Sequence, residues 1–99
     1  MKTDELIPVN EICIHHGIER SFVLSLRESG LLEVITLDEE TYVPIGELRN
    51  LEKMANLHYE MDINIEGIEA IAHLLQRVTD LQHQVAQLLH RLDVHDARG

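Results

Sequence analysis

The chain has 99 residues, of which 44% are apolar and 26% are charged, the ordinary mixture of one globular domain with a modest core. Eighteen acidic residues against eight Lys and Arg give a net charge of -10, which disfavours binding to nucleic acid or to anionic membranes. The single cysteine, Cys13, excludes an internal disulfide, and no apolar run reaches the ~18 residues of a membrane span, so we expect a cytoplasmic protein.

Two short helices separated by a glycine are predicted near the start of the chain. The first begins with Asn10 as its N-cap and ends at Gly17, and Pro8 before it allows at most an edge strand. The second runs from about Glu19 to Gly30, with apolar residues at helical spacing. Together they predict a helix-turn-helix.

Residues 31–44 predict a β-hairpin, because β-branched and aromatic residues lie on both sides of the acidic turn Asp38-Glu39-Glu40. A hairpin directly after a helix-turn-helix occupies the position of a wing. Helical periodicity returns at Ile45 and ends near residues 62–64.

The last helix carries a coiled-coil pattern, since its apolar residues alternate in steps of three and four from Ile68 to Leu92. We expect a winged head over residues 1–62, a coiled-coil-like helix over 63–93 and a disordered tail over 94–99. A helix about 40 Å long is too long for so small a head to cover. We therefore predict a homodimer, with a helix folded back on its own head as the alternative. The predicted dimer interface consists of Leu75, Val78, Leu81, Gln82, Val85, Leu88, Leu89 and Leu92.

No catalytic, cofactor or metal site is predicted. His15 and His16 are adjacent and diverge by about 100° on a helix, while His83 and His90 are two turns apart, so neither pair can share an ion. Cys13 lies on the inner side of a short helix, where a thiol acts as a small apolar group. The glycines are scattered and form no phosphate loop. We expect no enzymatic activity, no cofactor and no metal.

The net negative charge of the chain lies in its first two-thirds. Residues 1–69 hold fifteen acids and five Lys and Arg, whereas residues 70–99 hold three of each. This asymmetry predicts an acidic head that meets a partner and a neutral helix that packs, although excess acid can also serve solubility alone. The candidate acidic patch for partner binding consists of Glu19, Glu28, Glu33, Asp38, Glu39 and Glu40.

The order of these elements, with Arg-Glu-Ser-Gly-Leu-Leu at residues 27–32, resembles the MerR-like helix-turn-helix superfamily. The resemblance implies a mainly α fold: a winged helix-turn-helix with a small β-hairpin wing and a long C-terminal dimerisation helix. DNA-binding members carry Arg-Tyr-Tyr-Glu before the Gly-Leu, and a basic wing. Here residues 24–27 are Leu-Ser-Leu-Arg and the wing is acidic, so two phosphate-contacting elements are missing or reversed in sign.

Residues 57–75 are similar to a segment of the CbpM-type chaperone modulators, in which Ile-Asn-hydrophobic-x-Gly-Ile leads into a long terminal helix. In that pattern Asn64 is an N-cap and Gly67 is a small residue in the first turn. The resemblance implies a non-enzymatic protein that binds the J-domain of a DnaJ-like co-chaperone, CbpA, and inhibits its action on DnaK. An acidic protein would compete for the basic helix that a J-domain presents to DnaK.

Two other functions stay open. One is a module of an unrelated complex. The other is a MerR-like transcriptional regulator that retains the DNA-binding role of the fold. In that case the phosphate contacts would come from Arg20, Arg27, Arg49 and Lys53.

Overall fold

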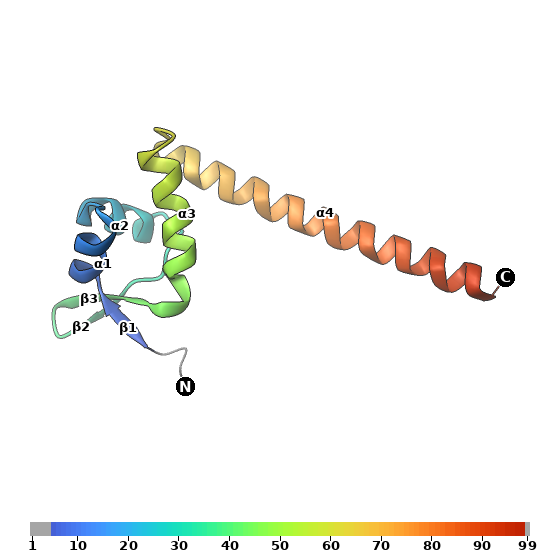
Figure 1. The fold of residues 1–99 in the computed structure, drawn as a ribbon, viewed down its shortest axis with the longest axis horizontal. Helices are drawn as coiled ribbons and strands as arrows, with labels where there is room; N and C mark the ends of the chain where they lie inside the picture. Colours follow the sequence, from blue (N-terminus) through green and yellow to red (C-terminus); the bar gives the residue numbers. More distant parts are fainter. Residues whose placement is uncertain (1–4, 99) are drawn as a thin grey trace. The chain divides into compact units, whose positions relative to one another are not determined.

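The computed structural model describes residues 5–98, with side chains up to residue 93. Within this range it confirms the mainly α winged helix-turn-helix with a small sheet and a long C-terminal helix (Figure 1). The chain divides into two compact units, Met1–Glu69 and Ala70–Gly99, and we call the first the head. In chain order the elements are β1 (Leu6–Pro8), α1 (Val9–His16), α2 (Arg20–Glu28), β2 (Ile35–Leu37), β3 (Glu40–Pro44), the 3-10 helix η2 (Ile45–Glu47), α3 (Leu48–Tyr59) and α4 (Ile65–Arg98).

Helix α1 begins at Val9, directly after β1, and its N-cap position is occupied by Pro8. The prediction that Asn10 caps this helix is therefore wrong. Proline already has the φ of a helix start, here -59°, so the helix begins before Asn10. The Asn10 Oδ1 atom instead accepts a hydrogen bond from Arg20 Nη1 at 3.0 Å. Gly17 ends the helix with a φ of 65°, as predicted.

Strands β2 and β3 form the predicted hairpin. Asp38 and Glu39 make a two-residue turn with φ angles of 51° and 68°, the left-handed pair that matches the twist of a hairpin. Glu40, which we expected in the turn, is the first residue of β3 and pairs with Leu37, because a two-residue turn is enough to reverse the chain. Strand β1 pairs antiparallel with the other side of β3 in the order β1-β3-β2, so Pro8 lies on an edge strand as predicted.

The core of the head is formed by all its helices and the inner face of the sheet. Ile68, in the first turn of α4, has no exposed surface, so the head extends past residue 62, where we expected it to end. Thr41 points inward from β3, and its Oγ1 atom is buried without a hydrogen-bond partner. The buried apolar residues are Val9, Ile12, Ile18, Phe22, Val23, Leu26, Leu32, Val43, Leu51, Met54 and Ile68.

The helix that the sequence predicts from Ile45 begins as η2 and continues as α3, which ends at Tyr59. The chain then turns through Asp62, whose φ of 58° cannot continue a right-handed helix. The predicted cap at the start of α4 is confirmed, since Asn64 Oδ1 accepts a hydrogen bond from the Gly67 N–H at 2.8 Å.

Gly67 lies in a tight contact at this junction. A Cβ atom at this position would lie 2.6 Å from Ile63 Cγ2, closer than real Cβ atoms approach, and 3.1 Å from Asn64 Oδ1, a tight contact. Glycine fits here because a side chain would lack space, and not because the backbone has a positive φ.

From Ala70 to residue 93, α4 buries no side chain, and Ile71 is the one that is partly covered. The backbone of α4 continues to Arg98, past residue 93, because no glycine or proline interrupts the sequence before Gly99. The rest of the predicted tail, Gly99, lies outside the described residues. Among the helices that are described, none is both long and apolar enough to cross a membrane.

Candidate partner-binding surface

An aromatic cluster fixes α2, the second helix of the helix-turn-helix, against the end of α3. Phe22 from α2 stacks on His58 with ring centroids 4.6 Å apart, and the Tyr59 ring meets Phe22 edge-on at 5.4 Å. The Tyr59 hydroxyl oxygen accepts a hydrogen bond from the Glu19 backbone N–H at 2.9 Å. His58 donates from Nδ1 to the Ile63 carbonyl at 2.8 Å. These contacts determine which side chains of α2 face the solvent.

The exposed charges of α2 cancel. Arg20 and Arg27 are matched by Glu28 at the last position and by Glu19 at the N-cap. The Arg20 guanidinium also donates to Asn10, as described above. A helix without net charge has no overall attraction for the phosphates, from whose neutralisation proteins gain much of their affinity for DNA.

Residues 28–47, from the end of α2 to the end of η2, contain six acids and no Lys, Arg or His. The hairpin brings Asp38, Glu39 and Glu40 together, and all three are exposed. Glu33 lies beside a further acid, because its backbone N–H donates to Glu47 Oε1 at 3.5 Å. The wing and the residues that flank it therefore form an acidic region with no neutralising base in this stretch.

The six residues of the candidate acidic patch are all exposed, but they do not form one cluster. The three hairpin acids are adjacent, whereas Glu19 and Glu28 lie at opposite ends of α2, about 13 Å apart along its axis. The hairpin acids are therefore the part of the patch that one partner element can contact together.

The outer face of the sheet is mostly apolar, which the sequence reasoning missed. In β3 the side chains of Thr41 and Val43 are buried, so Tyr42 and Pro44 point to the opposite side. The register of β1 and β2 places four more apolar side chains beside them. This sheet face consists of Leu6, Pro8, Ile35, Leu37, Tyr42 and Pro44, with Glu40 beside Leu37 at the end next to the hairpin turn.

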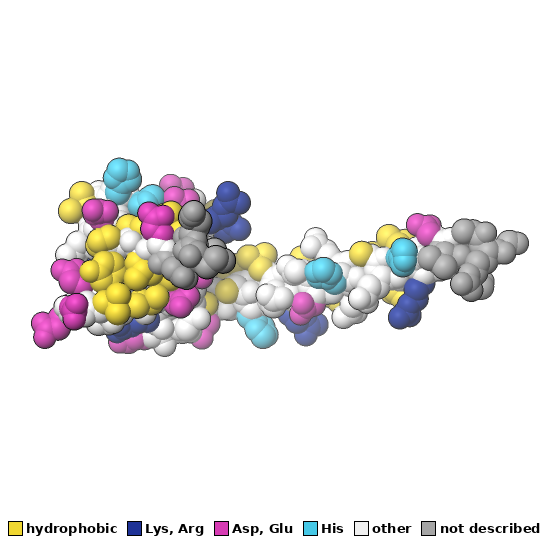
Figure 2. Space-filling model, turned by 90° about the horizontal axis from the view of Figure 1, so that it is seen from below, with side chains coloured by type: hydrophobic (Ala, Val, Ile, Leu, Met, Phe, Trp, Pro, Cys, Tyr) yellow, Lys and Arg dark blue, Asp and Glu magenta, His cyan; other side chains and the backbone are white. Residues whose placement is uncertain are grey.

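Figure 2 looks at the head from below and shows a continuous apolar area over the sheet, with acidic side chains around it and at the tip of the hairpin, and with Lys or Arg side chains also at the edge of the head. Leu37 is 51% exposed and the other five are partly exposed. An antiparallel sheet with one solvated face normally alternates apolar and polar residues. The signal that could have revealed this face is the lack of alternation at residues 6–9 and 42–44, where both faces of the strand are apolar.

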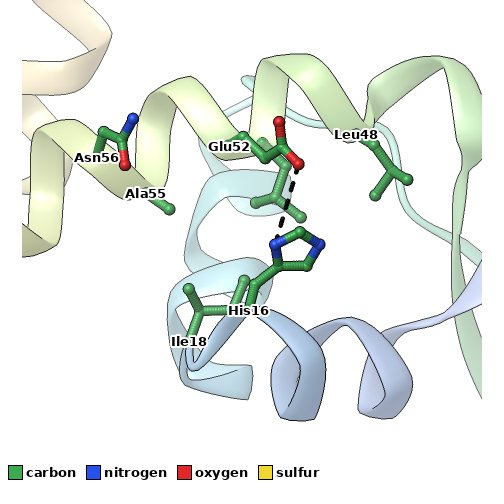
Figure 3. Close-up of a pocket in the computed structure, with 7 residues that line it drawn as sticks. His16, Ile18, Leu48, Glu52, Ala55 and Asn56 are labelled. Atoms are coloured by element: carbon green, nitrogen blue, oxygen red, sulfur yellow. Dashed lines mark ion pairs between the residues drawn. The ribbon is translucent and has the colours of Figure 1, made fainter.

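A small groove lies between α1 and α3. In Figure 3 His16 from α1 points toward Glu52 on α3, with His16 Nδ1 and Glu52 Oε2 4.0 Å apart. The volume beneath this pair is about 90 Å³, well below the size of ordinary ligand sites. Its walls are mostly apolar and carry no nucleophile. The lining residues are His16, Ile18, Leu48, Leu51, Glu52, Ala55 and Asn56.

The groups that could support chemistry are dispersed. Among the described residues, no three His, Cys, Asp or Glu side chains lie close enough together to hold a metal ion. Burial raises the pKa of the Cys13 thiol above its ordinary value, which keeps it neutral and unreactive.

The unit Ala70–Gly99 carries the second candidate surface, the apolar stripe of α4. The structure places all eight predicted interface residues in solvent, and the seven apolar ones are 47–59% exposed. On the polar side, Gln76 Nε2 donates to Asp80 Oδ1 at 3.1 Å, an interaction within the helix itself. In this single chain the stripe has no partner among the described residues of its own unit.

The chain matches the model of a known protein family. A family model described as "MerR HTH family regulatory protein" matches residues 7–90, from β1 to the last third of α4. No curated protein and no solved structure gives a significant match. The matched span covers the helix-turn-helix, the hairpin and most of the α4 stripe, and it does not distinguish DNA-binding members from protein-binding ones.

Proposed function

The chain belongs to the MerR HTH family of regulatory proteins, and we propose that it acts as a protein-binding modulator without enzymatic activity. Its partner is the J-domain of a DnaJ-like co-chaperone of the CbpA type, and binding inhibits the action of that co-chaperone on DnaK. The similarity of residues 57–75 to the CbpM-type modulators supports this choice. The Asn64 cap and the close packing at Gly67 fit the pattern of that segment.

The observation that carries the proposal is the sign of the charge on the wing. Residues 28–47 hold six acids and no base, and the three hairpin acids project into solvent. A duplex brought against this wing would meet like charge and would release no counterions through it. A basic polypeptide would instead be attracted to the same surface.

The proposed mechanism is competition for one surface. The J-domain uses a basic helix to contact DnaK, and the acidic region of the head covers that helix when it binds. Complementary charge speeds association and orients the two proteins, so the interaction weakens as salt rises. DnaK keeps its basal activity, because the modulator acts on the co-chaperone.

We propose further that the protein is a homodimer joined through the stripe of α4. Each apolar side chain that leaves water there contributes about 1.5–3 kcal/mol, which gives a strong drive for pairing two helices. Gln82 at a core position would fix the register of the pair.

The ATPase activity of DnaK tests the proposed function. We expect increasing amounts of the protein to abolish the stimulation by a CbpA-type co-chaperone and to leave the basal rate unchanged. Added co-chaperone should restore the stimulation, because the inhibition is competitive. Stimulation that persists at a large excess of the protein would refute the proposal.

A DNA-binding regulator is the second candidate, favoured by the helix-turn-helix itself and by the exposure of Arg27, Arg49 and Lys53. A gel-shift titration with random duplex DNA distinguishes the two. We expect no shift near physiological salt, and a clear shift there would favour the regulator.

A further inference from the structure

The sheet face has the width of one helix. Neighbouring strands lie about 4.8 Å apart, so the two edge strands are about 10 Å from each other, which is close to the diameter of an α-helix. The longest strand, β3, has five residues and spans about 17 Å, the length of three helical turns. A single amphipathic helix of this length would cover the face.

The charges near the sheet face restrict what can bind. The acids Asp38, Glu39 and Glu40 lie at one end of the hairpin, and Glu5 and Glu33 are exposed next to β1 and shortly before β2. A second copy of this chain would bring the same acids against these, so like charges would oppose self-association through this face. A helix with basic flanks would place its charges opposite the acids and its apolar side chains on the strands.

We propose that the sheet face is the docking site for one amphipathic helix of a basic partner. The inference rests on the proposed function, since the helix belongs to the J-domain of the co-chaperone. It adds that the apolar contacts are made by the outer face of the sheet, including Tyr42 on the middle strand and Leu37 beside the hairpin turn. The acids of the hairpin then orient the bound helix. The apolar contacts lower the dissociation rate of the complex and account for most of its affinity.

Two substitutions and a matched control test this site. Leu37→Ser and Tyr42→Thr remove apolar surface from the face and keep residues that a strand accepts. Ile14→Ser makes the same kind of change on α1, where Ile14 is 84% exposed. The affinity of each full-length variant for a purified CbpA-type co-chaperone is measured by isothermal titration calorimetry. Thermal unfolding shows which variants keep the fold, and Leu37→Ser is interpreted alone if Tyr42→Thr does not.

We expect Leu37→Ser and Tyr42→Thr each to weaken binding about tenfold or more, with Ile14→Ser equal to wild type. Equal binding by wild type and all three variants would overturn the docking site and leave the proposed function intact. Equal weakening by Ile14→Ser would also overturn it, because the loss would not be specific to the face. Failure of the wild-type protein to bind the co-chaperone would refute the proposed function, and the inference with it.

Discussion

The head and the segment of α4 from Ala70 onward differ in how they bury apolar residues. The head packs three helices, the inner face of a sheet and the first turn of α4 around one core, in which Val9, Leu26 and Ile68 have no exposed surface. The α4 segment leaves every apolar side chain of its stripe about half exposed or more. The head therefore has a core of its own, whereas the α4 segment leaves an exposed apolar stripe, through which we propose that it contacts another chain.

The largest effect should come from breaking that contact. Leu89→Asp places a carboxylate in the stripe, and burying it unpaired costs several kcal/mol. We expect the dimer dissociation constant to rise at least about a hundredfold, since ~2.8 kcal/mol corresponds to that factor. Analytical ultracentrifugation measures the change.

The control for this change is Gln84→Asp, which puts the same charge on the polar side of the helix and should leave the dimer intact. A wild-type protein that sediments as a monomer at tens of micromolar would contradict the dimer itself. Dissociation by both variants would show that charge, and not the position in the stripe, is responsible.

A smaller effect is expected where the head meets the start of α4. Gly67→Ala adds a methyl group 2.6 Å from Ile63 Cγ2, and this overpacking outweighs the better helix propensity of alanine. We expect the free energy of unfolding to fall by about 1–2 kcal/mol in urea denaturation. Gly46→Ala is the matched control, because a Cβ there meets nothing within 4 Å. Equal stability of the two variants would show that the junction is not tightly packed.

The smallest effect concerns a polar group in the core of the head. Thr41→Val removes a buried hydroxyl that has no hydrogen-bond partner, and we expect a gain of about 1 kcal/mol in unfolding free energy. Thermal unfolding should shift upward by about 4–8 °C for a domain of this size. Thr36→Val, on the strand opposite and exposed, should change little. A loss of stability in Thr41→Val would mean that its hydroxyl has a partner.

Much of the fold could be predicted from the sequence where local chemistry determines the structure. Gly17 as a helix terminator, the hairpin around Asp38-Glu39 and the Asn64 cap are confirmed, because each depends on a residue and its immediate neighbours. The resemblance to the MerR-like superfamily is confirmed by the family match, while the CbpM-type specificity stays a prediction. The Asn10 cap failed, because the helix begins at Val9 directly after Pro8, and the Asn10 side chain accepts a hydrogen bond from Arg20 instead.

The candidate surface was less predictable, because it depends on which strands pair. The acidic residues could be found from the sequence alone. The distance between Glu19 and Glu28, however, depends on the length of α2. The sheet face forms only when β1 pairs with β3. The pairing brings Leu6 and Pro8 beside Tyr42, residues that lie more than thirty positions apart in the sequence. No local pattern encodes that register.

Charge reversal on the wing tests the proposed function most directly. The triple variant Asp38→Lys, Glu39→Lys and Glu40→Lys is compared with a control triple at the exposed acids of the α3–α4 junction, Glu60→Lys, Glu66→Lys and Glu69→Lys, which changes the net charge equally.

The measurement is the affinity for a CbpA-type co-chaperone at low and at high salt. We expect the wing triple to bind at least about tenfold more weakly than the control triple at low salt, with a difference that shrinks as salt rises. Equal affinities of the two triples at low salt would contradict the proposed function.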